Sequence, residues 1–200
     1  MDDQAYKVGV SPRVKSRGNK QPSSGYICIG MTDERLAELN VPMMVPDNQE
    51  RHRTAYTVTV DVKEGAKQTL TPSFGRLTYF YPLGTSTGIS AHDRALTARS
   101  LVSNSSRPSD FSRPGHLVPL RARPGGVLER MGHTEASVDL CKLTGQPPGG
   151  LLCELVNDDI EGSMARRDDC RAFADRWGLK MISVEMLVQW RLSQSNVREE

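Results

Sequence analysis

Most of the chain alternates between short apolar segments and segments that begin and end like helices. Residues 25–32 (GYICIGMT) and 151–156 (LLCELV) have the apolar composition of strands, and residues 54–62 (TAYTVTVDV) alternate in the manner of a half-buried strand. Ser90, with Asp93 three residues later, has the pattern of a helix N-terminus. Strands that alternate with helices pack in layers, so the sequence predicts a layered α/β fold rather than a bundle or an all-β domain.

Caps and turns predict the remaining boundaries. A helix capped by Thr32 is expected to end near Leu39, because Pro42 cannot continue it. The sequence also predicts a strand at 117–121, a turn at 124–126, a helix from a Thr134 cap to about Gly145, a helix at 168–177 closed by Gly178, a strand at 180–183, and a last amphipathic helix capped by Ser183.

Two regions do not fit the alternation. Residues 1–24 are polar and rich in Ser, Pro, Gly and basic side chains, which predicts a disordered tail. Residues 67–84 cluster aromatic side chains without regular periodicity, as a hairpin, a lid or an insertion would. The expected organisation is therefore a tail at 1–24 and a single domain at 25–200 with an insertion at about 66–86.

The composition excludes several classes of protein. The 26 basic and 24 acidic side chains are evenly mixed, so no nucleic-acid partner is expected. Apolar runs are far shorter than the roughly 20 residues that cross a bilayer, and the start of the chain lacks the apolar region of a secretory signal. The 4 cysteines show no C-x-x-C pair, which favours reduced thiols in a soluble, cytoplasmic protein.

The segment from Phe111 to Asp158 concentrates titratable side chains. In ERMGHTEA, the chain turns at Gly132 and enters a helix, and a helix N-terminus favours an anion. Arg130 adds a planar donor suited to phosphate. His133 lies beside this turn, where it could be either a metal ligand or a structural hydrogen-bonding residue.

Glu154 and His116 are two further candidates. Glu154 lies within the apolar segment LLCELV, where a desolvated carboxylate is costly unless it is paired, and where burial suits it to proton transfer. It could equally be a glutamate at a strand end that points to solvent. His116 follows the Arg113-Pro114-Gly115 turn and could act as a general acid or base, or hold a loop.

Several long segments, in order, resemble the 3,4-dihydroxy-2-butanone 4-phosphate synthase family, the lyases of riboflavin biosynthesis. They are SGYICIGMTDERLAELNVPMMV, TAYTVTVD, TGISAHDRALTAR, RPSDFSRPGHLVPLRARPGGVLERMGHTEASVDL and GLLCELVNDD. The spacing from His116 to Glu154 is uninterrupted. The resemblance implies a three-layer α/β/α sandwich around a mixed twisted sheet, incomplete on its N-terminal side.

The resemblance also implies an activity and a set of site residues. Family members convert D-ribulose 5-phosphate into 3,4-dihydroxy-2-butanone 4-phosphate and formate with Mg²⁺ or Mn²⁺, as homodimers with active sites near the subunit interface. By similarity, His116 and Glu154 are the catalytic residues and His133 is a metal ligand. The substrate-binding residues implied are Arg130, Met131, Gly132, His133 and Thr134.

Two parts of the sequence depart from the family. The family carries an acidic loop of the type D-D-E-x-R-E-N-E-G-D that supplies a metal-binding carboxylate, whereas residues 1–24 contain only Asp2 and Asp3 as carboxylates. A strand that accompanies this loop is also missing, which would leave a sheet edge unpaired. Residues 66–86 stand where relatives have only a few residues.

Three hypotheses remain open on the sequence alone. The first is a lyase of this family, and the second is a family member that only binds sugar phosphate or an intact subunit. The third, on chemistry alone, is another metal-assisted sugar-phosphate enzyme such as an isomerase or aldolase. Formate release separates the first hypothesis from the third, and a carboxylate-rich loop would separate it from the second.

Overall fold

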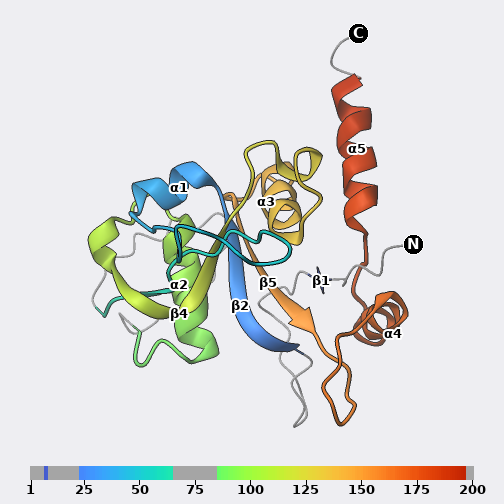
Figure 1. The fold of residues 1–200 in the computed structure, drawn as a ribbon, viewed down its shortest axis with the longest axis horizontal. Coiled ribbons are helices and arrows are strands. Elements are labelled where there is room, and N and C mark those ends of the chain that lie inside the picture. The colour runs from blue at the N-terminus through green and yellow to red at the C-terminus, as the bar shows by residue number, and fades with distance from the viewer. Residues whose placement is uncertain (1–6, 9–22, 65–84, 197–200) are drawn as a thin grey trace, which may run out of the picture.

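The chain forms a mixed sheet flanked by helices (Figure 1). The computed structural model describes residues 7–8, 23–64 and 85–196. The strands are β1 (Lys7–Val8), β2 (Ser23–Met31), β3 (Val60–Val62), β4 (Phe111–Arg121) and β5 (Gly149–Leu155), in the spatial order β1-β5-β2-β4-β3. β2 and β4 are parallel, and the other neighbouring strands pair antiparallel. The predicted mixed α/β fold is therefore confirmed.

Helices pack on both faces of this sheet. They are α1 (Asp33–Glu38), α2 (Ala91–Val102), α3 (His133–Leu143), α4 (Arg167–Trp177) and α5 (Val184–Asn196), with 3₁₀ turns η1 (Pro108–Asp110) and η2 (Gly126–Leu128). On one face, Ile29 of β2 shares a buried core with Leu96 and Leu101 of α2. On the other face, α3 crosses the sheet so closely that a side chain at Gly30 or Gly150 would collide with Ser137. The sheet thus lies between α2 and α3.

Except at Thr134, the predicted helix boundaries that depend on a capping side chain or a C-terminal glycine are confirmed. The hydroxyls of Thr32, Ser90 and Ser183 each accept a hydrogen bond from the backbone amide three residues later, at 3.3, 3.0 and 3.2 Å. α4 ends at Gly178, whose φ of 62° is the left-handed conformation that glycine adopts without strain.

Thr134 was wrongly predicted as a cap, because α3 begins at His133 with Gly132 in the capping position, two residues before Thr134. Thr134 is buried and packs beside Gly30 of β2.

Two predicted strands are wrong or shortened. Residues 180–183 form no strand, because the apolar side chains of Leu179 and Met181 pack against Cys170 of α4 rather than alternating over a sheet. Of residues 54–62, only Val60–Val62 form a strand. The amide and hydroxyl of Thr57 both donate to the carbonyl of Pro119, at 3.1 and 2.8 Å, and proline has no amide to return a ladder bond.

The N-terminal prediction is corrected at two points. Lys7–Val8 pairs with Cys153 and Glu154 of β5, so this stretch of the sheet edge has a partner, and Ser23 already belongs to β2. The other residues of the predicted tail lie outside the described residues. The same is true of the predicted insertion at 66–86, except for Thr85 and Ser86.

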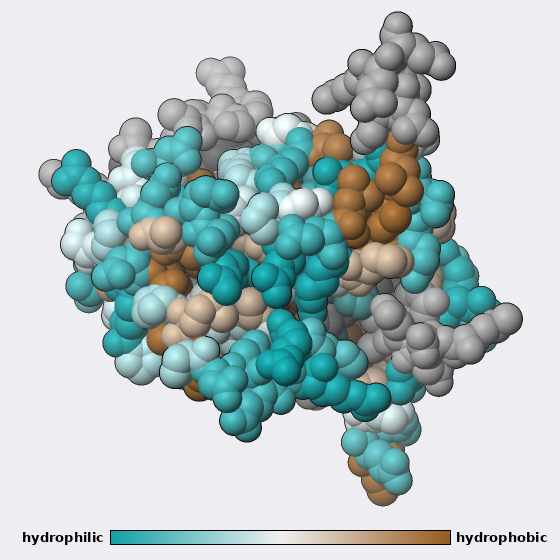
Figure 2. Space-filling model, turned by 45° about the horizontal axis from the view of Figure 1, so that its top comes forward, coloured by the Kyte–Doolittle hydropathy of each residue, from teal (hydrophilic) through white to brown (hydrophobic). Residues whose placement is uncertain are grey.

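α5 extends from one edge of the molecule (Figure 1). The side chains of Met186, Trp190 and Leu192 on this helix are exposed. Figure 2 shows a hydrophobic area at its upper right, on a face that is otherwise largely hydrophilic. In the part of the chain that the structure describes, no helix is long and apolar enough to cross a membrane.

A buried carboxylate fixes the loop that precedes α2. Asp93 accepts hydrogen bonds from the amide and hydroxyl of Ser86, at 3.3 and 3.0 Å, and from the amide of Gly88 at 3.1 Å. Thr85 holds the other end of the loop, because its hydroxyl donates to the carbonyl of Val62 at 2.5 Å. Burial alone would raise the pKa of Asp93, but hydrogen bonds, led by those from Ser86, lower it from 3.8 to about 2.

This pKa predicts a specific pH dependence of stability. The unfolded chain binds a proton at higher pH than the folded protein, so the carboxylate of Asp93 stabilises the fold above about pH 4 and loses this effect as the pH falls toward about 2. In urea unfolding, wild type should exceed Asp93→Asn in stability by a constant margin above about pH 4, and the margin should shrink below it. A margin that is equally large at pH 2 and pH 6 would contradict this role.

Candidate active site

His116 is held by a carboxylate from the neighbouring strand. The side chain of Asp61 in β3 accepts the backbone amide of His116 on Oδ1 at 2.9 Å, and its Oδ2 lies 2.6 Å from the ring Nδ1. The Asp61 side chain is only 11% exposed, whereas the imidazole is 44% exposed. The ring therefore has one edge on a buried carboxylate and the other edge open to solvent.

An irregularity in β4 creates this contact. Val60 pairs with Leu117, but the next residue, Asp61, pairs with Ser112, so residues 113–116 bulge out of the ladder. In a regular antiparallel ladder, Asp61 would pair with His116 through the backbone. Instead the bulge turns the amide and the ring of His116 onto the Asp61 side chain, which is how bulges commonly re-aim functional groups.

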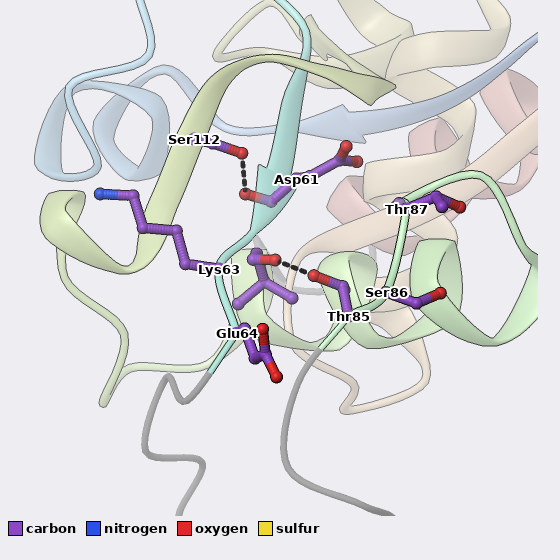
Figure 3. A pocket seen from close by; sticks show the side chains of 9 residues that line it. Asp61, Lys63, Glu64, Thr85, Ser86, Thr87 and Ser112 are labelled. Carbon is purple, nitrogen blue, oxygen red and sulfur yellow. Dashed lines mark hydrogen bonds between the residues drawn. The ribbon is translucent and has the colours of Figure 1, made fainter.

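Gly88 closes the other side of the pair. A side chain there would collide with the Asp61 carboxylate and lie 2.7 Å from Nδ1 of His116. The pocket in Figure 3, of about 240 Å³, lies beside this contact and is lined mainly by polar residues of β3 and of the loop that Asp93 holds. Glu64 and Thr85 also line it, at the two ends of the described ranges. The Asp61 side chain points toward the side of the strand on which the Thr87 loop lies.

Glu154 lies on the same face of the sheet as His116. Leu152 belongs to a buried cluster on this face, and Glu154 is two residues further along β5. Asp61, which holds the His116 ring, lies between Val60 and Val62 of the opposite core and therefore points to the same face. Alternate residues of a strand share a face. β2 separates the two candidates, so they are at least two strand spacings of about 4.8 Å apart. Glu154 is partly buried, between the two alternatives that the sequence left open.

Tyr56 covers this face beside the buried cluster. Burial raises the pKa of Tyr56, and neighbouring groups that are negatively charged at high pH, among them Cys28, Glu50 and Glu154, add to the effect. Each of these groups disfavours a second negative charge next to it. Tyr56 is thus expected to stay protonated beside Glu154 at neutral pH.

The start of α3 carries the remaining candidates. Arg130 donates from Nη1 to Oε2 of Glu135 at 2.6 Å and from Nη2 to the carbonyl of His52 at 3.1 Å. Glu135 is 1% exposed, and its other oxygen accepts the amide of Arg123 at 3.0 Å. A side chain at Gly132 would collide with both Arg130 and Glu135, which explains the glycine in this turn. Since a guanidinium has five N–H groups, Arg130 keeps donors for a ligand.

The face of the sheet relates these groups to one another. α3 packs over Gly30, which is two residues along β2 from Cys28 and so lies on the face of His116 and Glu154. His133 is the first residue of the helix, and Met131 ahead of it is exposed. The predicted residues therefore meet on one face, in two groups. Among the residues described, no three His, Cys, Asp or Glu side chains come together in a way that could hold a metal ion.

Asp61 and Glu135 are the side chains that sequence reasoning missed. Asp61 is the one charged residue of the stretch TVTVDV, and a lone charge in a predicted strand is the same signal that singled out Glu154. Glu135 lies in the first turn of the helix, where an acidic side chain interacts favourably with the helix dipole, so nothing in the sequence assigned it to the site. The partner of each carboxylate depends on the tertiary fold.

Comparison with known proteins identifies the family. The sequence model of 3,4-dihydroxy-2-butanone 4-phosphate synthase matches residues 19–74 and 78–190. The enzyme of that name from Schizosaccharomyces pombe is 54% identical over 166 residues, covering 82% of this chain and 72% of the relative. A riboflavin biosynthesis protein of Nocardia farcinica is 45% identical over 169 residues, covering 84% of this chain and 36% of the relative.

A solved structure agrees. The crystal structure of a 3,4-dihydroxy-2-butanone 4-phosphate synthase in complex with two magnesium ions is 44% identical, with a TM-score of 0.71 over 86% of this chain and 76% of that chain. The predicted resemblance is thereby confirmed, and the relatives support the enzyme rather than the non-catalytic alternative. The chain belongs to the 3,4-dihydroxy-2-butanone 4-phosphate synthase family, whose members are lyases of riboflavin biosynthesis.

Proposed function

We propose that the chain converts D-ribulose 5-phosphate into 3,4-dihydroxy-2-butanone 4-phosphate and formate, with His116 and Glu154 as its catalytic residues. The observation that carries the assignment is their placement on one face of the sheet, in a chain of this family. The exposed edge of the His116 ring and the partly buried Glu154 carboxylate flank β2. A small sugar phosphate between them would have a proton acceptor on either side.

Proton transfer is the task of this pair. Forming an enediol removes a proton from a carbon next to the carbonyl, which requires a base within hydrogen-bonding reach of that carbon. Nε2 of His116 can take or return such a proton because Nδ1 is occupied by Asp61. Glu154 then serves the opposite side of the substrate, and Tyr56 beside it excludes water from the sheet face.

The start of α3 binds the phosphate in this proposal. The first-turn amides of a helix have no intrahelical acceptors and favour an anion. Arg130, Met131, Gly132, His133 and Thr134 form this segment, and the hydrogen bond that Arg130 donates to Glu135 holds its guanidinium in one orientation. Exposed Met131 contributes its backbone and apolar contact only.

A divalent cation, Mg²⁺ or Mn²⁺, is the proposed cofactor, with His133 as one ligand. Support comes from the related structure that holds two magnesium ions. The described residues do not fit a complete site, because hard cations prefer several oxygen ligands and no three-residue cluster is present among them. No step of the proton transfer above depends on the metal.

The proposal also includes a homodimer in the cytoplasm. Exposed apolar side chains on α3 and α5, including Leu143 and Trp190, supply surface that a second copy could cover. The cysteines at 28, 141, 153 and 170 form no disulfide in the described part of the chain, which suits a reducing compartment. The evenly mixed charges of the sequence do not favour a nucleic-acid or membrane partner.

Formate release tests the function directly. Purified protein incubated with D-ribulose 5-phosphate should release formate with Mg²⁺ or Mn²⁺ and stop when EDTA is added. An isomerase or aldolase would consume the substrate without formate. No formate from a protein that is folded by circular dichroism would overturn the proposed activity and restore the binding-only alternative.

Glu154→Gln should lower turnover by about 10²- to 10⁴-fold, because the amide keeps the shape of the side chain but cannot accept a proton. Substrate affinity, measured by calorimetry, should change little. Glu161→Gln, an exposed change of the same kind, is the matched control and should keep wild-type turnover. A Glu154→Gln variant with near-normal kcat would remove Glu154 from the mechanism.

His133→Ala should abolish metal-dependent turnover and weaken Mn²⁺ binding measured by calorimetry or electron paramagnetic resonance. The reason is the loss of the one imidazole ligand that this chain supplies in the proposal. His52→Ala, in the exposed 47–53 loop, removes an imidazole elsewhere and should leave Mn²⁺ affinity unchanged. Equal Mn²⁺ affinity in wild type and His133→Ala would show that His133 is no ligand.

A further inference from the structure

We propose that Asp61 is the positioning residue for His116: it keeps the ring proton on Nδ1 and directs Nε2 toward the substrate. The inference rests on the proposed function, since it assigns the residue through which His116 becomes competent. It is carried by the contact between the two side chains, by the burial of Asp61 and by the bulge that brings them together.

The two-point contact fixes the ring. One Asp61 oxygen receives the His116 amide at 2.9 Å and the other lies 2.6 Å from Nδ1, so backbone and ring are bound by the same carboxylate. An ionised carboxylate can only accept hydrogen bonds, so the short contact requires a hydrogen on Nδ1. A neutral ring then has its free electron pair on Nε2, which is the form a general base needs.

Asp61 has no competing partner in the part of the chain that the structure describes. The carboxylate is almost fully buried, and both of its hydrogen-bonding contacts are to His116. A buried carboxylate is costly without donors, and here the imidazole supplies one of the two. Nearby backbone groups are satisfied separately: the amide of Gly115 donates to the Thr59 hydroxyl at 3.0 Å, and the Ser112 hydroxyl donates to the Asp61 carbonyl at 3.2 Å.

The surrounding backbone leaves the pair little freedom. Gly115 lies so close to β3 that a side chain there would overlap the backbone of Val60. On the opposite side, Gly88 lies against the carboxylate and Nδ1, and Asp93 holds that glycine by its amide. The ring edge that carries Nε2 is thus the part of the pair left accessible.

The proton balance follows from this arrangement. When His116 acts as a base, the carbon-bound proton moves to Nε2 and the electron pair of the C–H bond enters the enediolate. The ring becomes an imidazolium whose Nδ1 hydrogen stays on the bond to Asp61, so the carboxylate stabilises the new positive charge. Return of the proton from Nε2 restores the starting state.

Nuclear magnetic resonance of ¹⁵N-histidine-labelled protein tests the positioning without any turnover. The chain has 4 histidines, and His116→Gln assigns the His116 signals. At alkaline pH, wild type should carry the ring hydrogen on Nδ1. In Asp61→Asn, the side-chain amide donates to Nδ1, so the hydrogen should move to Nε2. A wild-type ring protonated on Nε2, or an unchanged tautomer in Asp61→Asn, would overturn the proposal.

Kinetics then show whether Asp61 acts through His116. Asp61→Asn should lower kcat by about 10²- to 10⁴-fold and leave KM within about threefold of wild type. In a His116→Gln background the same substitution should cost less than about threefold, because the residue it positions is already gone. Equal losses in both backgrounds would show that Asp61 acts independently of His116 and would refute the positioning role.

Two controls separate this result from misfolding and from failure of the proposed function. Asp33→Asn changes an exposed carboxylate in the first turn of α1 and should leave kcat unchanged, and unfolding curves check that Asp61→Asn is folded. If wild type releases no formate, the proposed function fails while the tautomer measurement still decides the role of Asp61.

Discussion

Four carboxylates that are removed from water hold the irregular segments of this protein, and each accepts hydrogen bonds from a loop, a 3₁₀ turn or a strand bulge. They are Asp61, Asp93, Glu135 and Asp139. A buried acceptor left without donors costs roughly 1–3 kcal/mol, and more when it is charged. Moving the segments that donate to these carboxylates would therefore cost free energy, because the buried oxygens would lose their hydrogen bonds. These hydrogen bonds fix the position of irregular backbone, which has no helix or sheet ladder to hold it.

Two of these carboxylates join parts of the chain that are far apart in sequence, because Asp61 bonds to His116, 55 residues away, and Asp139 to Arg191, 52 residues away. Asp139 of α3 accepts the amide of Val127 at 2.9 Å and a bond from Arg191 of α5 at 2.7 Å, so it ties η2 and the last helix to α3. Glu135, one turn earlier, fixes Arg130 in the same loop. α3 is thus the anchor of the loop that leads into it. Asp61 and Asp93 do the same for β4 and for the loop before α2.

The elements with local signals could be predicted from the sequence. Helix caps at Thr32, Ser90 and Ser183 depend on contacts three residues apart, and the glycine at 178 acts through its own φ. The segments at 180–183 and 54–59 were wrongly predicted as strands, because alternation does not specify whether a partner strand exists. Packing on α4 explains the first of these segments.

The site was predictable in composition but not in its connections. His116 and Glu154 stood out as titratable groups near apolar strands, and the sheet places them on one face. Their catalytic roles stay predictions. Asp61 lies 55 residues from His116, and the bulge that joins them is visible only in the paired strands. No pattern within one segment carries that information.

Gly30 and Gly150 also set a dimension of the site. Both lie beneath α3, where even one added carbon would collide with Ser137, so helix and sheet meet at backbone contact. The spacing between His133 at the helix start and the strands that carry His116 and Glu154 is consequently at its lower limit. Sequence change at these two positions can only widen it. Replacing these glycines could therefore adapt the site to a bulkier substrate. A narrower site would require substitutions among the other side chains that line it.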